Sequence, residues 1–404
     1  MREYQFTSES VTEGHPDKVC DQISDAVLDD ILNHDQQARV ACEVAVNTGL
    51  VLVFGEISTA EYCPVAEITR NTLKRIGYGE CPGFSAHSCA VLVSIDEQSP
   101  DIAQGVNASL EARQGSTDPL DAVGAGDQGM MFGFACHESE QVAPGTFMPL
   151  PIHLSHQLAM RLAEVRHLKQ MPQLALDGKT QVTVRYADFA PQQVERVLIG
   201  AQHLAGVEHA ALQQALFEQV LAPSIPAALC PHGSHRDIDL LVNPTGVFVK
   251  GGPEADSGLT GRKIIVDTYG GMARHGGGAF SGKDPTKVDR SASYYARYVA
   301  KNLVAAGVAE RLELQVSYAI ARAQPLSLSV QTYGTGQVEE PRIEQLLRDG
   351  GLFDFRPLAI IKQLNLLETR YEPLAAYGHF GRTDLDVSWE QLDQVDAIKQ
   401  ALKL

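Results

Sequence analysis

One arrangement of residues occurs three times along the chain: an amphipathic helical pattern followed by strands rich in β-branched residues. In the first copy, apolar residues recur every four positions from Val19 to Ile31, which is typical of a helix with one buried face. The ranges 38–46 and 50–57 then have the composition of strands, and Asn47-Thr48-Gly49 between them predicts a tight turn. The first copy is therefore expected to be a helix packed on a hairpin.

The second and third copies repeat this order without visible sequence similarity to the first. A helix is predicted over 152–167 and a strand over 181–186. A further helix is predicted over 291–306, ending at Gly307, with strands over 313–320 and 326–332 behind it. The recurrence predicts an α+β fold of three related modules.

Domain boundaries follow from these modules. We expect an N-terminal α+β domain over 1–102, a central one over 121–248 and a C-terminal one over 249–404. The connection over 97–128 is rich in Asp, Gln, Gly, Ser and Ala and offers little apolar surface to bury. We predict a flexible active-site lid there; the alternative is a plain surface loop with a short helix around 107–113.

Charge and hydropathy exclude several classes of partner. With 404 residues and 44% hydrophobic content the chain can bury a large core. Its net charge of −17 would repel nucleic acid and anionic membranes over most of the surface. No apolar run approaches the ~18 residues that cross a bilayer, and no targeting segment opens the chain, so a cytoplasmic location is expected.

The seven cysteines are odd in number and include no CxxC pair, so neither a disulfide framework nor a zinc site is predicted. Cys89 lies within Ser88-Cys89-Ala90-Val91-Leu92-Val93 and is expected to be a buried strand residue. A reactive thiol is the alternative.

An anionic ligand would need a local basic pocket, and the range 250–290 is the candidate because Lys and Arg outnumber Asp and Glu there. Glycines are also densest in this range, and glycine lets consecutive backbone amides turn toward an anion. Gly277 to Lys283 imitates a GxxxxGK phosphate loop, but Asp284 follows where Ser or Thr should bind magnesium. We therefore predict a phosphate-holding stretch that is not a true P-loop; a tight solvated loop is the alternative.

A second cluster of polar residues precedes the first predicted helix. Pro16 suits a first helical turn, which places His15 at the cap and Asp17 at the helix N-terminus. Asp17 is either a capping acid, favoured by the helix dipole, or a metal ligand. The later acids in the same four-residue spacing are expected to form a solvated face: Asp21, Asp25 and Asp29.

Long blocks of the sequence match one enzyme family. The blocks are 6–18, 124–129, 243–246, 258–270, 276–290 and 375–382. With these blocks the chain resembles the S-adenosylmethionine synthetases, or methionine adenosyltransferases, of the bacterial and eukaryotic type, over nearly its whole length. The resemblance implies three interlocked α+β domains in a pseudo-threefold arrangement. It also implies a homo-oligomer, usually a tetramer, with active sites between two subunits of a dimer.

The resemblance also implies roles for individual residues. As catalytic residues it implies His15, Lys179, Arg262 and Lys283. As ATP-binding residues it implies His15, Asp177, Lys179, Phe248, Asp256, Arg262, Lys263, Ala279 and Lys283. As methionine-binding residues it implies Glu56, Gln98, Asp127, Asp256 and Lys287. For two Mg²⁺ ions it implies Asp17 and Asp289, and for K⁺ it implies Glu43. One departure is Val247, where many members carry Arg, and whatever that arginine contributes is absent or supplied elsewhere.

The implied reaction joins ATP and L-methionine: the thioether sulphur attacks ribose C5′, triphosphate leaves, and the triphosphate is then cleaved to phosphate and pyrophosphate. A thioether has no proton to remove, which agrees with the absence of a recognisable nucleophile-and-base motif in the sequence. Lysine, arginine and magnesium ions can stabilise the departing triphosphate. Two rival hypotheses are a magnesium-dependent kinase or NTPase, and a non-catalytic subunit that binds an adenosine ligand.

Overall fold

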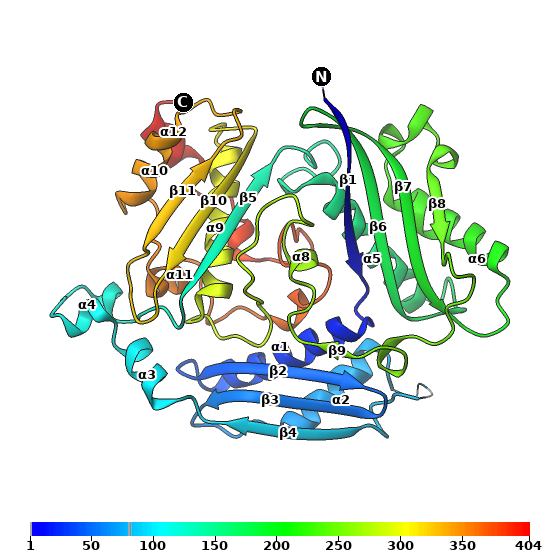
Figure 1. Ribbon diagram of the computed structural model, residues 1–404, viewed down its shortest axis with the longest axis horizontal. Helices are drawn as coiled ribbons and strands as arrows, with labels where there is room; N and C mark the ends of the chain where they lie inside the picture. Colours follow the sequence, from blue (N-terminus) through cyan, green and yellow to red (C-terminus); the bar gives the residue numbers. More distant parts are fainter. Residues whose placement is uncertain (1, 80, 82) are drawn as a thin grey trace.

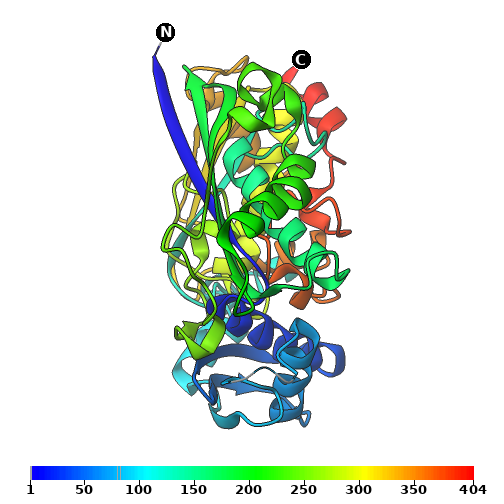
Figure 2. The same ribbon diagram turned by 90° about the vertical axis from the view of Figure 1, so that its right-hand side faces the viewer.

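The computed structural model describes residues 2–79, 81 and 83–404, and its strands form three separate sheets around the centre of the molecule (Figure 1). Both termini lie at the same end, above the two upper sheets of that view. In the turned view the helices lie to one side of β1 and its sheet (Figure 2). The α+β class expected from the sequence is confirmed.

Each predicted copy of the repeat is present as a helix followed by an antiparallel hairpin. The first copy is α1 (Pro16–His34), β2 (Arg39–Asn47) and β3 (Leu50–Ser58). The second is α5 (Leu150–His167), β6 (Leu174–Ala187) and β7 (Ala190–His203). The third is α9 (Val288–Ala305), β10 (Arg311–Tyr318) and β11 (Ser327–Gln331).

A strand from elsewhere in the chain completes each sheet on the same side of its hairpin. β9 (Gly258–Leu259), β1 (Glu3–Val11) and β5 (Gly129–Cys136) lie antiparallel to β2, β6 and β10 respectively. Two sheets have a further, parallel strand: β4 (Ala90–Asp96) beside β3, and β8 (Asp239–Val242) beside β7. The equivalent placement of these strands supports the threefold repeat, and the sheets interlock because their strands are exchanged between segments.

The remaining helices are short or peripheral. They are α2 (Val65–Ile76), α3 (Pro100–Asn107), α4 (Leu110–Arg113), α6 (His209–Leu216), α7 (Ala222–Ser224), α8 (Ile264–Asp267), α10 (Glu340–Arg348), α11 (Pro357–Gln363) and α12 (Val395–Leu402). In the part of the chain that the structure describes, no helix is long and apolar enough to cross a membrane. The predicted lid over 97–128 contains α3 and α4, and its mobility stays a prediction.

Two apolar cores stabilise the fold. One runs from α1 and its hairpin through β5 to α9 and the C-terminal helices, and includes the single tryptophan, Trp389. The other lies between α5, the sheet β1-β6-β7-β8 and α6. Cys89 is buried one residue before β4, and burial raises the pKa of its thiol.

The prediction of a solvated acidic face on α1 was wrong. Asp21 and Asp25 are 0% exposed and Asp29 is 7% exposed. The four-residue spacing places them on the side of α1 that packs against other segments, where cations and backbone amides face them. Asp21 accepts from Lys18 at 2.9 Å, and Asp25 accepts from both terminal nitrogens of Arg290 at 2.9 and 2.7 Å. Buried charges are found where such partners exist.

We expect Asp25→Ala to destabilise the protein by about 3–5 kcal/mol, because it leaves the buried Arg290 guanidinium without its counter-charge. Urea unfolding followed by the fluorescence of buried Trp389 measures the change. Arg196→Ala is the matched control: Arg196 and Asp239 form an exposed pair at 2.6 Å, whose loss should cost no more than ~1 kcal/mol. Equal losses in the two variants would contradict the role given to Asp25.

Candidate active site

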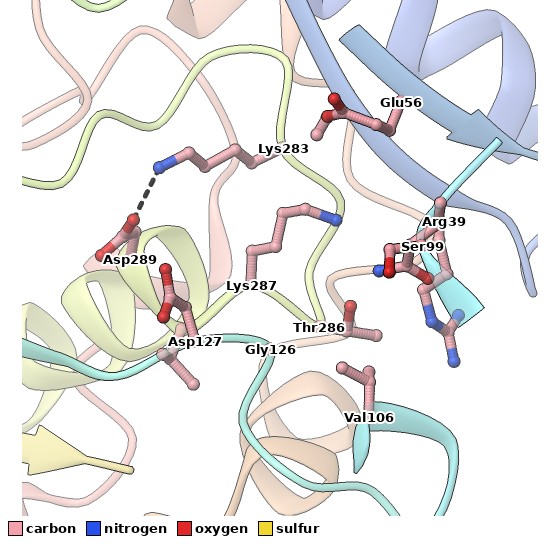
Figure 3. A pocket seen from close by; sticks show the side chains of 13 residues that line it. Arg39, Glu56, Ser99, Val106, Gly126, Asp127, Lys283, Thr286, Lys287 and Asp289 are labelled. Carbon is pink, nitrogen blue, oxygen red and sulfur yellow. Dashed lines mark hydrogen bonds and ion pairs between the residues drawn. The ribbon is translucent and has the colours of Figure 1, made fainter. Parts of the chain in front are cut away.

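A cavity of about 290 Å³ lies where β2, β3, the start of α9 and the 97–128 segment meet. Six residues with implied roles line it: Glu56, Gln98, Asp127, Lys283, Lys287 and Asp289. Figure 3 shows the acids and both lysines around the same space. Four of the five residues implied for methionine therefore line one cavity, although they are spread over the sequence from position 56 to position 287. The fifth, Asp256, lies exposed outside this cavity.

A hydrogen bond to β2 holds the loop that carries Lys283 and Lys287. Cys42 donates its amide to the Gly282 carbonyl at 2.9 Å, and Gly282 donates its own amide to Asp25 at 2.8 Å. Gly282 has φ +80°, and a Cβ there would lie 1.9 Å from the Cys42 carbonyl oxygen, so only glycine fits. This contact directs the next residue, Lys283, toward the cavity.

Asp284 does not face the cavity as it would in a P-loop; it is 1% exposed and turned inward. Its carboxylate accepts from the Val40 amide at 2.8 Å and from Lys287 Nζ at 2.6 Å. Burial opposes ionisation, but the charge and hydrogen bond of Lys287, with further hydrogen bonds, hold the pKa of Asp284 below its usual range. Asp284 thus orients Lys287, and a true P-loop is excluded.

Asp289 lies in the first turn of α9 and pairs with Lys283 Nζ at 2.6 Å (Figure 3). The glycine-rich stretch passes directly over it, since a Cβ on Gly278 would lie 2.3 Å from the Asp289 carboxyl carbon. The stretch therefore packs closely on this acid.

A second group of implied residues surrounds the start of α1. His15 is the N-cap residue, and its Nδ1 accepts from the Asp17 amide at 3.2 Å. Nδ1 is thus the acceptor, and the proton of the neutral ring lies on Nε2. Burial, with the charges of Lys263 and Lys179, lowers the pKa of His15 to about 3. At neutral pH His15 can donate a hydrogen bond through Nε2 without being a cation.

Asp17 is 2% exposed and is surrounded by donors. Lys263 Nζ lies 2.5 Å from Oδ2, Arg262 Nε lies 3.6 Å from Oδ1, and the Leu259 amide donates to Oδ1 at 3.0 Å. Burial opposes ionisation, but the hydrogen bond and charge of Lys263 outweigh it and lower the pKa of Asp17. Asp17 is therefore a carboxylate at neutral pH.

The other implied ATP-binding residues extend this second group. Asp177 accepts from the Gly252 amide at 2.9 Å, and burial raises its pKa to about 6. Lys179 is exposed on β6, Phe248 is half-buried, and Ala279 lies beside Gly261. Val247 is 68% exposed, and its apolar side chain has no hydrogen-bonding group in place of the family's Arg. Glu43, implied for K⁺, is exposed on β2 and has no ion pair within the described residues.

Within residues 2–79, 81 and 83–404 of one chain, no hydrogen bond or ion pair joins the cavity group to the group around His15. The cavity also has walls that the sequence did not single out: Arg39, Ser99, Val106 and Thr286. Arg39 and Ala41 alternate with buried residues along β2, so strand periodicity could have placed them on the same face as Glu43.

Comparisons with known proteins agree with the resemblance. Three family models match: the S-adenosylmethionine synthetase N-terminal domain over residues 3–100, the central domain over 122–248 and the C-terminal domain over 250–391. S-adenosylmethionine synthase of Desulforudis audaxviator is 56% identical over 402 residues, covering 99% of each chain. S-adenosylmethionine synthase of Clostridium tetani is 54% identical over 398 residues, covering 98% of this chain and 99% of the relative. The chain belongs to the S-adenosylmethionine synthetase family.

Proposed function

We propose that this chain is a methionine adenosyltransferase that forms S-adenosylmethionine from ATP and L-methionine. Sulphur attacks ribose C5′, the complete triphosphate leaves, and the triphosphate is then cleaved to phosphate and pyrophosphate. The observation that carries the proposal is the cavity in which Glu56, Gln98, Asp127 and Lys287 meet Lys283 and Asp289. It is large enough for a small amino acid and is bounded by the cations that a triphosphate requires.

The side chains suit a reaction that needs placement and charge rather than a base. The attacking sulphur carries no proton, so acceleration comes from holding sulphur and C5′ together and from stabilising the leaving oxygens. Neutral His15 would donate from Nε2 to the leaving oxygen, and Lys179, Lys263 and Lys283 would offset the charge of that oxygen. Arg262, which lies 3.6 Å from Asp17 Oδ1, would orient the triphosphate. Glu56 and Asp127 carry negative charge beside the sulfonium that forms.

Asp17 and Asp289 each offer a single carboxylate, which suits Mg²⁺. Asp289 is paired with Lys283, Asp17 is paired with Lys263 and Arg262, and the described residues hold no group of three or more metal-binding side chains. Mg²⁺ is commonly bound by one or two carboxylates together with waters and substrate phosphates, which is the donor set available here. Two Mg²⁺ ions would supply charge compensation for the phosphates. K⁺ would be held by Glu43.

The two separate groups of implied residues suit an active site completed by a second subunit. Each group lacks part of the implied set, and Leu92 and Met130, on β4 and β5, are 54% and 46% exposed. A homo-oligomer, usually a tetramer, with sites at the dimer interface is therefore part of the proposal. The cytoplasmic location, the boundaries 1–102, 121–248 and 249–404, and the mobile lid over 97–128 remain predictions.

The products decide between this function and its rivals. Purified protein incubated with ATP, methionine, Mg²⁺ and K⁺ should yield adenosylmethionine, phosphate and pyrophosphate by mass spectrometry, with each product dependent on methionine. A kinase or NTPase would release ADP, and a non-catalytic subunit would bind ATP without forming phosphate. Either result would contradict the proposal.

The pKa of His15 generates a prediction about pH. Its folded value of about 3 lies below the ordinary 6.5, so the ring stays neutral from pH 5 to 8 and contributes no step to the rate profile there. His15→Ala should lower kcat by roughly 10²–10³-fold, as for removal of one donor to a developing oxyanion.

The side-chain ¹⁵N shifts of His15 measure this directly and should report the Nε2–H form throughout that pH range. His34→Ala, at the exposed end of α1, is the control and should leave kcat unchanged. A His15 titration with a midpoint between 6 and 7, or a His15→Ala variant of normal kcat, would refute the assignment.

A further inference from the structure

A second cavity of about 290 Å³ lies between α5 and the loop 377–384. Its apolar walls are Met148, Met160, Tyr377 and Phe380. It shares no lining residue with the candidate active site, and none of the residues with implied roles reaches it. The volume is at the lower end of the ~300–1,000 Å³ typical of small-molecule sites.

Two polar side chains on one face of α5 line this cavity without partners. His153 and Gln157 are four residues apart, so they project side by side. His153 is 9% exposed, and neither side chain makes a hydrogen bond to the described residues. A polar group this buried normally has a hydrogen-bond partner, so we expect a ligand atom to bond the His153 ring.

Burial lowers the pKa of His153 to about 4, so its imidazole is neutral at pH 7 and offers one donor and one acceptor nitrogen. The Gln157 amide also offers both. Together they can recognise a ligand edge that carries a donor beside an acceptor.

The charged groups of the cavity are already paired. Arg382 donates to both oxygens of Asp384 at 2.8 Å, and its other nitrogen donates to the carbonyls of Ala376 and Gly378 at 2.9 and 3.0 Å. His156 bonds Ser10 Oγ through Nδ1 at 2.8 Å, and its buried Nε2 lies beside Gly378 without a hydrogen-bond partner among the described residues. Among the described residues that line this cavity, no unpaired cation is therefore left to bind an anion, and no unpaired carboxylate is left to bind a metal ion.

We propose that this cavity binds a small neutral heteroaromatic molecule of nucleobase size, whose ring packs against Met160 and Tyr377 and whose polar edge bonds His153 and Gln157. Thioethers and aromatic rings pack favourably on a planar ring. The proposal does not depend on the reaction at the candidate active site.

Benzimidazole is the probe, because its two rings carry one N–H donor and one acceptor nitrogen and are neutral at pH 8. Calorimetric titration of the full-length protein, saturated with Mg²⁺ and a non-hydrolysable ATP analogue, should detect saturable binding. His153→Phe, which keeps a ring but removes both nitrogens, should weaken that binding at least tenfold. His34→Phe, on exposed α1 surface, should leave it unchanged.

Indole, which keeps the N–H donor but lacks the acceptor nitrogen, should bind at least tenfold more weakly than benzimidazole. Thermal unfolding of His153→Phe checks that the variant is folded, and Gln157→Leu gives a second variant with the same expected loss. The proposal is overturned if benzimidazole shows no saturable binding, if the nucleotide analogue displaces it, or if indole binds equally well. Unchanged binding to both folded cavity variants would overturn it too.

Discussion

The segment 258–290 is held in place by buried carboxylates on the first helix, and the positions of the candidate site's cations depend on this. Asp17, Asp21 and Asp25 accept the amides of Leu259, Gly261 and Gly282 at 3.0, 2.9 and 2.8 Å. Burying such charges is costly unless partners surround them. Lys18 and Arg290 supply the counter-charges, so α1 and this segment stabilise each other.

This arrangement explains how a chain of net charge −17 brings cations to one site, where Arg39, Lys283 and Lys287 line the cavity together with three acids, Glu56, Asp127 and Asp289. Acids on α1, in the loop and on α9 pair with four cations of one segment: Arg262, Lys263, Lys283 and Lys287. The other three cations of 250–290 pair elsewhere: Lys250 with Glu254, Arg274 with Glu313 and Arg290 with Asp25. Local geometry, rather than net charge, determines where an anion can bind.

Local patterns in the sequence predicted much of the fold. Four-residue periodicity marked α1, and β-branched runs around Asn47-Thr48-Gly49 marked the β2–β3 hairpin, because both signals arise between near neighbours. The pairing of β1 with β6 joins Glu3 to Ala187, and nothing local in either strand specifies it. The regular spacing of the acids on α1 can be seen in the sequence. Their burial was not predicted, because Arg290, the partner of Asp25, is far away in the sequence.

The candidate site was predictable to the extent that its residues stand in long family blocks. Asp127, Lys283, Lys287 and Asp289 stand in those blocks, whereas Glu56 and Gln98 were implied by the resemblance over the rest of the chain, and the fold brings all six to one cavity. Arg39 was missed because cavity walls are set by tertiary packing, and Thr286 was not singled out although it stands in the block 276–290. The inward turn of Asp284 likewise depends on the Val40 amide opposite it.

We propose that cations and carboxylates from distant segments, fixed by α1, surround the triphosphate of ATP. A crystal structure of the protein with Mg²⁺, a non-hydrolysable ATP analogue and methionine tests it most directly. Lys263 and Lys283 should lie on the phosphates, Asp17 and Asp289 beside the metal ions, and methionine against Glu56 and Asp127. A triphosphate bound with these lysines and acids directed away from it would show that this arrangement does not hold ATP.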